Sequence, residues 1–234
     1  RLAQRGMSGP AEPFTGQSGL HSIVGNFDWE FPAPDGHLIA RTHMKCFPIC
    51  YHGQSAAWAA LELHRQVNAA AIRGIEVATY RQARNMMGAD ASRWAPESKE
   101  TADHSLPFVV ATGLLHGRID SSSFTPERLG DPDIAALMGK VKVIEDATLS
   151  AGYPDTAATR VSIDTGTGTP AMLEVPYPKG HANLPMDDAQ VEAKFLDLFQ
   201  VFGSAAQARR LLGLLWSLEG QAQFGSITAA CAAA

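Results

Sequence analysis

The chain has 234 residues, of which 45% are hydrophobic and 18% charged, a composition typical of a soluble protein of one or two domains. Its net charge of −5 argues against nucleic-acid binding, because nucleic-acid-binding surfaces are usually basic. No apolar run approaches the roughly 18 residues that a membrane-spanning helix needs, so we expect no membrane partner. The three cysteines, Cys46, Cys50 and Cys231, make no disulfide framework and favour a reducing compartment. A lone C-x3-C pair also lacks the second pair of ligands that a structural zinc site requires.

The N-terminal 36 residues are rich in glycine and proline. They predict a helix end, "RLAQRG", followed by a long surface segment. Because the chain begins at Arg1 inside this helical pattern, we expect it to be part of a longer protein. A short strand is predicted at 37–43, and a helix at 54–71 that buries Ala56, Ala59, Ala60, Leu63 and Val67.

The middle of the chain alternates between helix and strand signals. A half-buried strand is predicted at 74–80, and Ser105 and Gly117 predict the start and end of a helix. Residues 125–141 suggest two short helices. Three strand-like runs follow, "KVKVIED", "ATRVSID" and "AMLEVPY", of which the last two are joined by a hairpin, "TGTGT". The pattern predicts an α+β fold with a mainly antiparallel sheet.

The C-terminal part reads as two amphipathic helices. Asp187 is a candidate cap for the first helix, whose apolar face comprises Val191, Phe195, Leu198, Phe199 and Phe202. The second helix starts at Ser204 and is expected to bury Leu211, Leu212, Leu215 and Leu218. These faces have few partners within the chain, so we expect them to belong to a helical domain that is mostly missing.

Four segments in order resemble the MmgE/PrpD family, which includes 2-methylcitrate dehydratase, cis-aconitate decarboxylase and iminodisuccinate epimerase. They are "LAQRGMSGP", "MKCFPICYHGQSAAWAALEL", "WAPESKETADHSLPFVVATGLLHG" and "YPKGHANLPMDDAQVEAKF". The resemblance implies an all-helical domain, a smaller α+β lid and an active site between them. On this pattern, residues 1–37 end the helical domain, 38–177 form the lid, and 178–234 are helices that return to the helical domain. The family's N-terminal half, which supplies an aspartate, a histidine and a second lysine, is absent.

The resemblance also implies a lyase of propionate metabolism that works without a metal or another cofactor. The expected reaction is that of a hydro-lyase of the 2-methylcitrate dehydratase type acting on a di- or tricarboxylate. Decarboxylase or epimerase (isomerase) activity, or a non-catalytic subunit of a split family member, are the alternatives. The expected partners are the substrate, the N-terminal half and a second copy in a homodimer. The expected compartment is the cytoplasm, or the mitochondrial matrix in a eukaryote.

A dense polar cluster before the helix at 54–71 supplies the candidate site. Lys45 matches the lysine that opens the family's lid motif and is expected to bind a carboxylate or transfer a proton; otherwise it is a solvated strand lysine. His52 is a candidate to protonate a leaving hydroxyl, or else to bond the helix start. Gln54 and Ser55 lie where helix amides favour an anion, and Tyr51 is a further candidate substrate contact, although Ser55 also fits a plain cap.

Three other polar residues are expected to be structural or to lie at an interface. Asp103 and His104 could form a carboxylate–imidazole pair but more often cap a helix. His181, with Lys179 beside it, is read as part of a hinge between the lid and the helical domain.

Overall fold

The structure, a computed structural model, describes residues 3–17, 19–27, 39 and 42–231. Contacts divide the chain into two units, Arg1–Arg41 and Thr42–Ala234. The first unit contains a 3-10 turn at Ala3–Arg5 and the short helix α1 at Leu20–Val24. Most of the strand predicted at 37–43 lies outside the described residues, and Thr42 and His43 belong to no strand. The predicted boundaries at 37/38 and 177/178 remain predictions.

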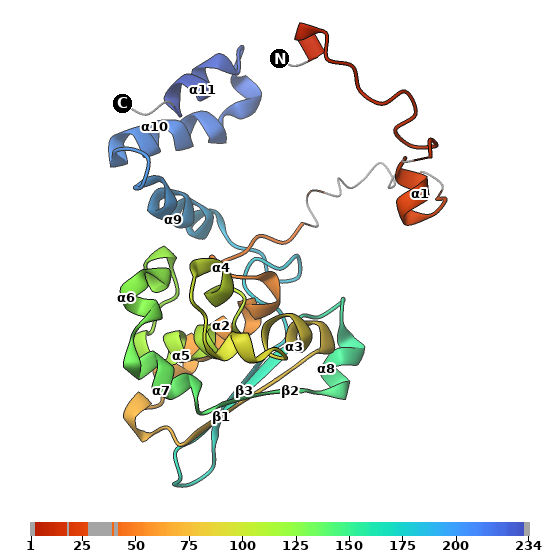
Figure 1. Cartoon of the computed structure of the whole chain (residues 1–234). Helices are drawn as coiled ribbons and strands as arrows, with labels where there is room; N and C mark the ends of the chain where they lie inside the picture. The colour runs from red at the N-terminus through yellow and green to blue at the C-terminus, as the bar shows by residue number, and fades with distance from the viewer. Residues whose placement is uncertain (1–2, 18, 28–38, 40–41, 232–234) are drawn as a thin grey trace. The chain divides into compact units, whose positions relative to one another are not determined.

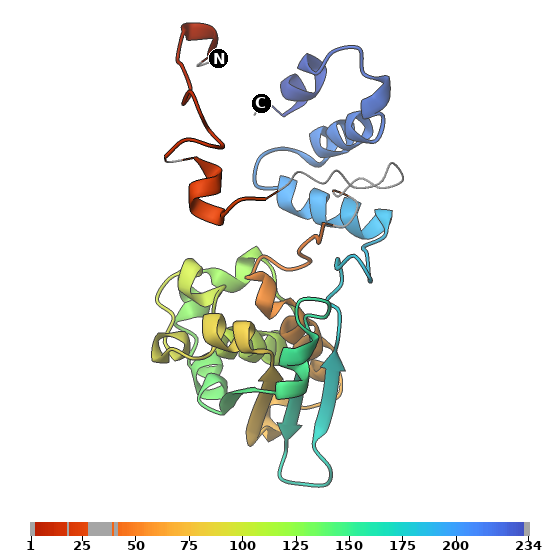
Figure 2. The same ribbon diagram turned by 90° about the vertical axis from the view of Figure 1, so that its right-hand side faces the viewer.

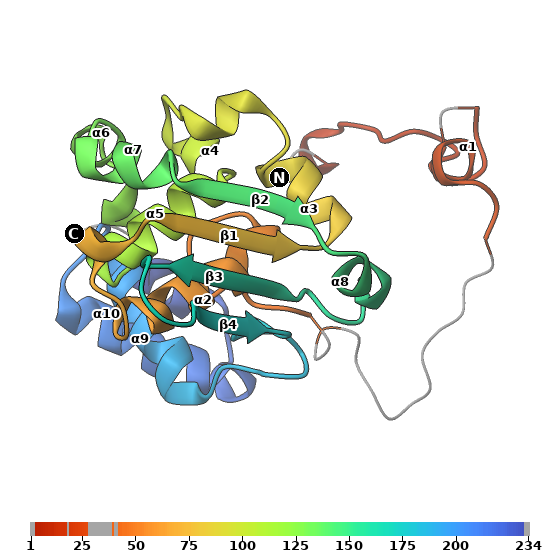
Figure 3. The ribbon, with the colours of Figure 1, turned by 90° about the horizontal axis from the view of Figure 1, so that it is seen from below.

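A four-stranded sheet organises the second unit (Figure 3). Its strands are β1 at Gly74–Thr79, β2 at Val141–Glu145, β3 at Thr159–Asp164 and β4 at Ala171–Val175. The order is β2-β1-β3-β4; β1 pairs with β2 in parallel, and the other two pairs are antiparallel. The predicted α+β class and the β3–β4 hairpin are therefore confirmed.

Two helices, α2 at Gln54–His64 and α5 at Leu106–His116, cover one face of the sheet (Figures 1 and 2). They pack closely, because a Cβ added to Gly113 of α5 would lie 2.9 Å from the Cβ of Ala60 in α2. The strand register places the polar residues Glu76, Lys142, Arg160 and Glu174 together on the other face. Figure 3 views the four strands from below. The shorter helices are α3 at Arg81–Met87, α4 at Lys99–Ala102, α6 at Pro126–Leu129, α7 at Pro132–Met138 and α8 at Ala147–Gly152.

Helix ends follow the predicted caps. Ser105 accepts a hydrogen bond from the Phe108 amide at the start of α5, and Gly117 ends this helix with a left-handed φ of 64°. The predicted helix at 54–71 is too long, however. It stops at His64, and a separate 3-10 turn begins at Ala69 because the Asn68 side chain accepts from the Ala70 amide.

The strand β1 is buried more fully than the predicted alternation allows. Ala78 and, just beyond the strand, Tyr80 are both buried, although the pattern places them on the exposed face. Tyr80 packs with Ala83 of α3 and Leu149 of α8, so helices cover this end of the strand on its second side as well. This burial fixes the position of the Tyr80 ring at the end of the strand.

Three C-terminal helices form a small cluster of their own: α9 at Asp188–Phe199, α10 at Ala205–Trp216 and α11 at Gly225–Ala230. The caps at Asp187 and Ser204 are confirmed. The predicted burial of Leu215 and Leu218 is wrong, because these side chains are 38% and 46% exposed and α10 ends at Trp216, before Leu218. Leu211 is buried, as predicted. The buried residues are Ala208 and Leu211 of α10 and Ile227 and Ala230 of α11, whereas α9 contributes only the partly buried Phe195 and Phe199. No helix in the described part of the chain is long and apolar enough to cross a bilayer.

The exposed apolar side chains near the end of α9 predict self-association or binding to a helical partner. Val201 is 81% and Phe202 70% exposed, and contiguous apolar patches of this kind are unusual on monomers. We expect Val201→Asp combined with Phe202→Asp to reduce both self-association in sedimentation and binding of a hydrophobic dye. Met172→Asp, at an exposed apolar position on β4, is the matched control and should change neither. A monomeric wild-type chain that binds no dye would contradict the prediction.

Candidate active site

The side chain of Gln54 holds the loop that precedes α2. Its Oε1 accepts hydrogen bonds from the amides of Cys46 and Phe47, both at 3.0 Å. Its Nε2 donates to the carbonyl oxygens of Phe47 at 2.9 Å and Ile49 at 3.3 Å. The buried amide therefore has no polar group left for a ligand, and it acts here by fixing the loop.

Ser55 is also committed to the protein itself. Its buried hydroxyl donates to the carbonyl oxygen of Ala157 at 2.6 Å and so connects the start of α2 to the segment before β3. The alternative of a helix cap is wrong, because Gly53 is the N-cap and no side chain caps this helix.

Four rings gather at the C-terminal end of β1 and form what we call the tyrosine–histidine cluster: Tyr51, His52, Tyr80 and Tyr153. The Nδ1 atom of His52 lies 2.7 Å from the Tyr80 hydroxyl, and the rings of Tyr80 and Tyr153 stack with centroids 4.5 Å apart. Burial lowers the pKa of His52, and the charge of nearby His104 lowers it further. Burial also raises the pKa of Tyr51 and Tyr80, so at neutral pH these two phenols and His52 are uncharged.

Sequence reasoning missed Tyr80 and Tyr153. Each is distant in the chain from His52, and neither belongs to a recognisable motif. His43 was missed as well; its Nδ1 lies 2.8 Å from the Tyr51 hydroxyl. The only available signal was a tyrosine directly after a strand, which does not indicate a contact with a histidine 28 residues away.

Asp103 and His104 form a carboxylate–imidazole pair beside the cluster, and the cap that the sequence favoured for them is supplied by Ser105 instead. Asp103 Oδ1 is 2.5 Å from His104 Nδ1, and Oδ2 accepts from Lys99 at 3.2 Å. The Asp103 carbonyl oxygen accepts from the amide of Cys50, directly before Tyr51. The pair therefore attaches the start of α5 to the loop that carries Tyr51 and His52.

His181 lies buried where the chain leaves the sheet. Its ring is 3.9 Å from that of His43, and its Nδ1 accepts from the Asn183 amide at 3.0 Å. The preceding residue, Gly180, accepts at its carbonyl oxygen from the Met44 amide at 2.8 Å. The structure thus joins His181, through His43 and Tyr51, to the tyrosine–histidine cluster.

Lys45 is exposed and directly precedes the loop held by Gln54. Within the described residues its side chain makes no hydrogen bond or ion pair. Lys194 of α9 donates to the carbonyl oxygen of Cys46 at 3.4 Å. Burial raises the pKa of the Cys46 thiol, and the charges of Lys194 and Lys179 partly oppose this rise, so both lysines lie near Cys46. The sequence pointed to one lysine, and the structure places two more beside the same loop.

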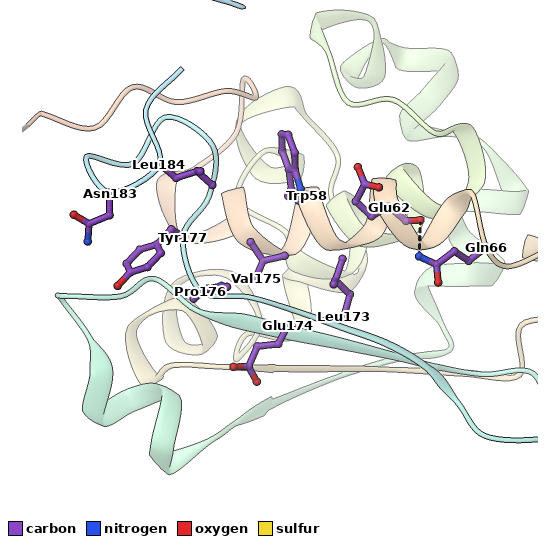
Figure 4. A pocket seen from close by; sticks show the side chains of 10 residues that line it. All are labelled: Trp58, Glu62, Gln66, Leu173, Glu174, Val175, Pro176, Tyr177, Asn183 and Leu184. Atoms are coloured by element: carbon purple, nitrogen blue, oxygen red, sulfur yellow. Dashed lines mark hydrogen bonds between the residues drawn. The ribbon is translucent and has the colours of Figure 1, made fainter. Parts of the chain in front are cut away.

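A separate groove of about 410 Å³ lies between α2 and β4 (Figure 4). Its walls include Trp58, Leu173, Val175 and Tyr177, and its charged side chains are Glu62 and Glu174. Two carboxylates would repel an anionic ligand, and neither Lys45 nor His52 lines this groove. In the described ranges, no three His, Cys, Asp or Glu side chains are grouped so that they could hold a metal ion.

Gly180 should tolerate no side chain. Its φ is +92°, and an added Cβ would lie 1.9 Å from the carbonyl oxygen of Met44. Gly168 is the matched control, with a φ of +73° and open space around it. We expect Gly168→Ala to lower the free energy of unfolding by about 1–2 kcal/mol, from the left-handed backbone alone. Gly180→Ala should lower the free energy of unfolding, measured by urea denaturation, clearly more than Gly168→Ala does. An equal decrease in the two variants would contradict the close contact between Gly180 and Met44.

The buried His181 should make the fold less stable in acid. Burial, and then the charge of His43, lowers its pKa in the folded state below the ordinary value of about 6.5. As the pH falls below about 6.5, the unfolded chain therefore binds a proton that the folded chain does not, and the unfolding free energy decreases. His181→Asn should show a smaller decrease between about pH 7.5 and 5.5 than the wild type. Asn183→Ala serves as control, and an undiminished decrease in His181→Asn would refute the assignment.

Comparison with known proteins identifies the family. Residues 47–219 match the model of the MmgE/PrpD C-terminal domain. The chain is 27% identical over 195 residues to the mitochondrial 2-methylcitrate dehydratase of Yarrowia lipolytica, covering 77% of this chain and 37% of that protein. It is 30% identical over 193 residues to 2-methylcitrate dehydratase of Cupriavidus necator, covering 71% and 39%, respectively. The match to the Escherichia coli enzyme of the same name is 28% over 162 residues, covering 66% and 33%. The chain thus spans between a third and two fifths of the length of these relatives, and it belongs to the MmgE/PrpD family.

Proposed function

We propose that this chain is the lid-side half of a cofactor-independent hydro-lyase of the 2-methylcitrate dehydratase type. The substrate is a di- or tricarboxylate, and the site is completed by an N-terminal helical half. The observation that carries the proposal is Lys45, an unpaired lysine next to a rigidly held loop, with Lys179 and Lys194 close by. The names of the relatives support the same reaction class.

The proposed reaction removes a proton α to a carboxylate and expels a β hydroxyl. It requires cations that hold the substrate carboxylates, and polar groups at the oxygen atoms that gain charge. Lys45 fits the first role, as carboxylate anchor or proton-transfer group. Tyr51 and His52 fit the second, since they lie on the loop that follows the held segment. Gln54 and Ser55 support the site by positioning.

The proposed assembly is a homodimer in the cytoplasm, or in the mitochondrial matrix of a eukaryote. Residues 38–177 act as its lid, and 178–234 return to the helical domain. A non-catalytic subunit is the second candidate, because two predicted substrate contacts, Gln54 and Ser55, use their polar groups within the protein. The two are distinguished by whether the chain, co-expressed with a family N-terminal half, turns over 2-methylcitrate, with cis-aconitate and iminodisuccinate as control substrates.

In the active assembly, Lys45→Ala should lower turnover about a hundredfold or more, the range for loss of an acid–base or charge-stabilising group. Lys142→Ala is the matched control, since Lys142 is an exposed lysine on β2. It should keep wild-type turnover. His52→Ala should cost less than Lys45→Ala, and Cys50→Ser very little. Wild-type rates in Lys45→Ala would mean that this lysine is only a solvated residue.

A further inference from the structure

The contact between Tyr80 and His52 constrains where the histidine carries its proton. Tyr80 is fully buried directly after β1, and its backbone carbonyl oxygen accepts from the amide of Arg84 in α3. Its ring is stacked on Tyr153 at an interplanar angle of 11°. The phenol oxygen is therefore held in place by the strand end, by α3 and by a neighbouring ring. His52 meets it with Nδ1 at 2.7 Å.

Only one placement of the protons satisfies both the Tyr80 hydroxyl and the His52 imidazole. A phenol carries a single proton, and among the described residues only His52 Nδ1 lies within hydrogen-bonding distance of the Tyr80 hydroxyl. A buried hydroxyl proton without an acceptor is unfavourable. The proton must therefore point at Nδ1, and Nδ1 must accept it. A neutral imidazole then carries its own proton on Nε2.

We infer that Tyr80 is a positioning residue that holds His52 as a neutral imidazole with its proton on Nε2. No hydrogen bond to Nε2 is found in the described part of the chain. This atom is also absent from the buried side-chain atoms that lack a partner, so it remains open to a ligand. The loop of Tyr51–Gly53 thus presents one fixed N–H donor.

The surroundings of His52 favour the neutral form. The titratable groups around it are Tyr51, Tyr80, Tyr153 and His104, with Asp103 behind His104. Tyr51 and Tyr80 are uncharged at neutral pH because burial raises the pKa of each, and Asp103 already pairs with His104 and Lys99. Burial lowers the pKa of His52 in the same direction. No unpaired carboxylate among the described residues is in contact with the imidazole to stabilise its cation.

A consequence for the reaction rests on the proposed function. A neutral imidazole whose Nδ1 accepts from Tyr80 has no free lone pair at Nε2, so it cannot remove the substrate proton there. Giving up the Nε2 proton completely would create an imidazolate, which is strongly unfavourable near neutral pH. His52 is therefore a hydrogen-bond donor to an oxygen that gains negative charge, such as a substrate carboxylate during proton abstraction. The proton for the leaving hydroxyl then comes from another group.

The test is the tautomer of His52 measured by NMR on the full chain labelled with ¹⁵N-histidine, at neutral pH. Loss of signals in His52→Asn assigns the resonances. We expect the Nδ1 shift of an unprotonated nitrogen and the Nε2 shift of a protonated one. In Tyr80→Phe the two shifts should move toward each other, because the ring is free to exchange its tautomers. Tyr153→Phe removes a hydroxyl from the same stack and should leave both shifts as in the wild type.

A protonated Nδ1 in the wild type overturns the inference, as do unchanged shifts in a folded Tyr80→Phe. If Tyr80→Phe does not fold, the nitrogen shifts of His52 in the wild type still test the inference. A Tyr80 hydroxyl proton that exchanges slowly with solvent and shows a cross-peak to the His52 ring supports the inference, and its absence counts against it. None of these measurements requires activity. An inactive assembly with the expected tautomer would therefore reject the proposed function and leave the role of Tyr80 intact.

Discussion

The buried amide of Gln54 is the constraint on which the candidate site depends. It accepts from two backbone amides and donates to two carbonyl oxygens, all within the Cys46–Ile49 segment. A carboxylate at this position could accept but not donate, and an apolar side chain would leave the loop amides and carbonyl oxygens unpaired inside the core. Because α2 is packed tightly against α5, the amide transfers the rigidity of the core to the loop. Lys45 precedes this fixed segment, and Tyr51 and His52 follow it.

Charged and uncharged side chains lie at opposite ends of that loop. Lysines gather on its upstream side, where they remain near the surface, whereas the histidine and tyrosines downstream are drawn into apolar surroundings. The same apolar burial that stabilises Tyr80 and Tyr153 against α3 and α8 keeps His52 uncharged. Cationic attraction and neutral hydrogen bonding thus come from different residue types, and the proposed polycarboxylate substrate would require both.

Local signals in the sequence predicted the fold well. Caps at Ser105, Asp187 and Ser204 and the β3–β4 hairpin depend on nearest neighbours, and all are present. The predictions were wrong where the burial of a side chain depends on segments that are distant in the sequence. The helical pattern of α10 predicts an apolar face but cannot tell whether another layer covers Leu215, or that the helix ends before Leu218.

The site was predictable only in part, for the same reason. The motif singled out Lys45, His52, Gln54 and Ser55, whose roles in a reaction remain predictions. It could not reveal that Gln54 holds the preceding loop, or that Ser55 bonds a carbonyl oxygen 102 residues away. The partner of His52 is likewise set by the way β1 ends against α3 and α8, which no pattern around His52 encodes.

The hydrogen bond between Met44 and Gly180 brings together two points of the chain that enclose the whole sheet. The segment from Met44 to Gly180, which contains the held loop and the whole sheet, therefore begins and ends at the same place. A segment with adjacent ends can be accommodated within another fold at a single point on its surface, with little disturbance on either side. The two ends can lie this close only because Gly180 has no side chain, since a Cβ there would overlap the carbonyl oxygen of Met44.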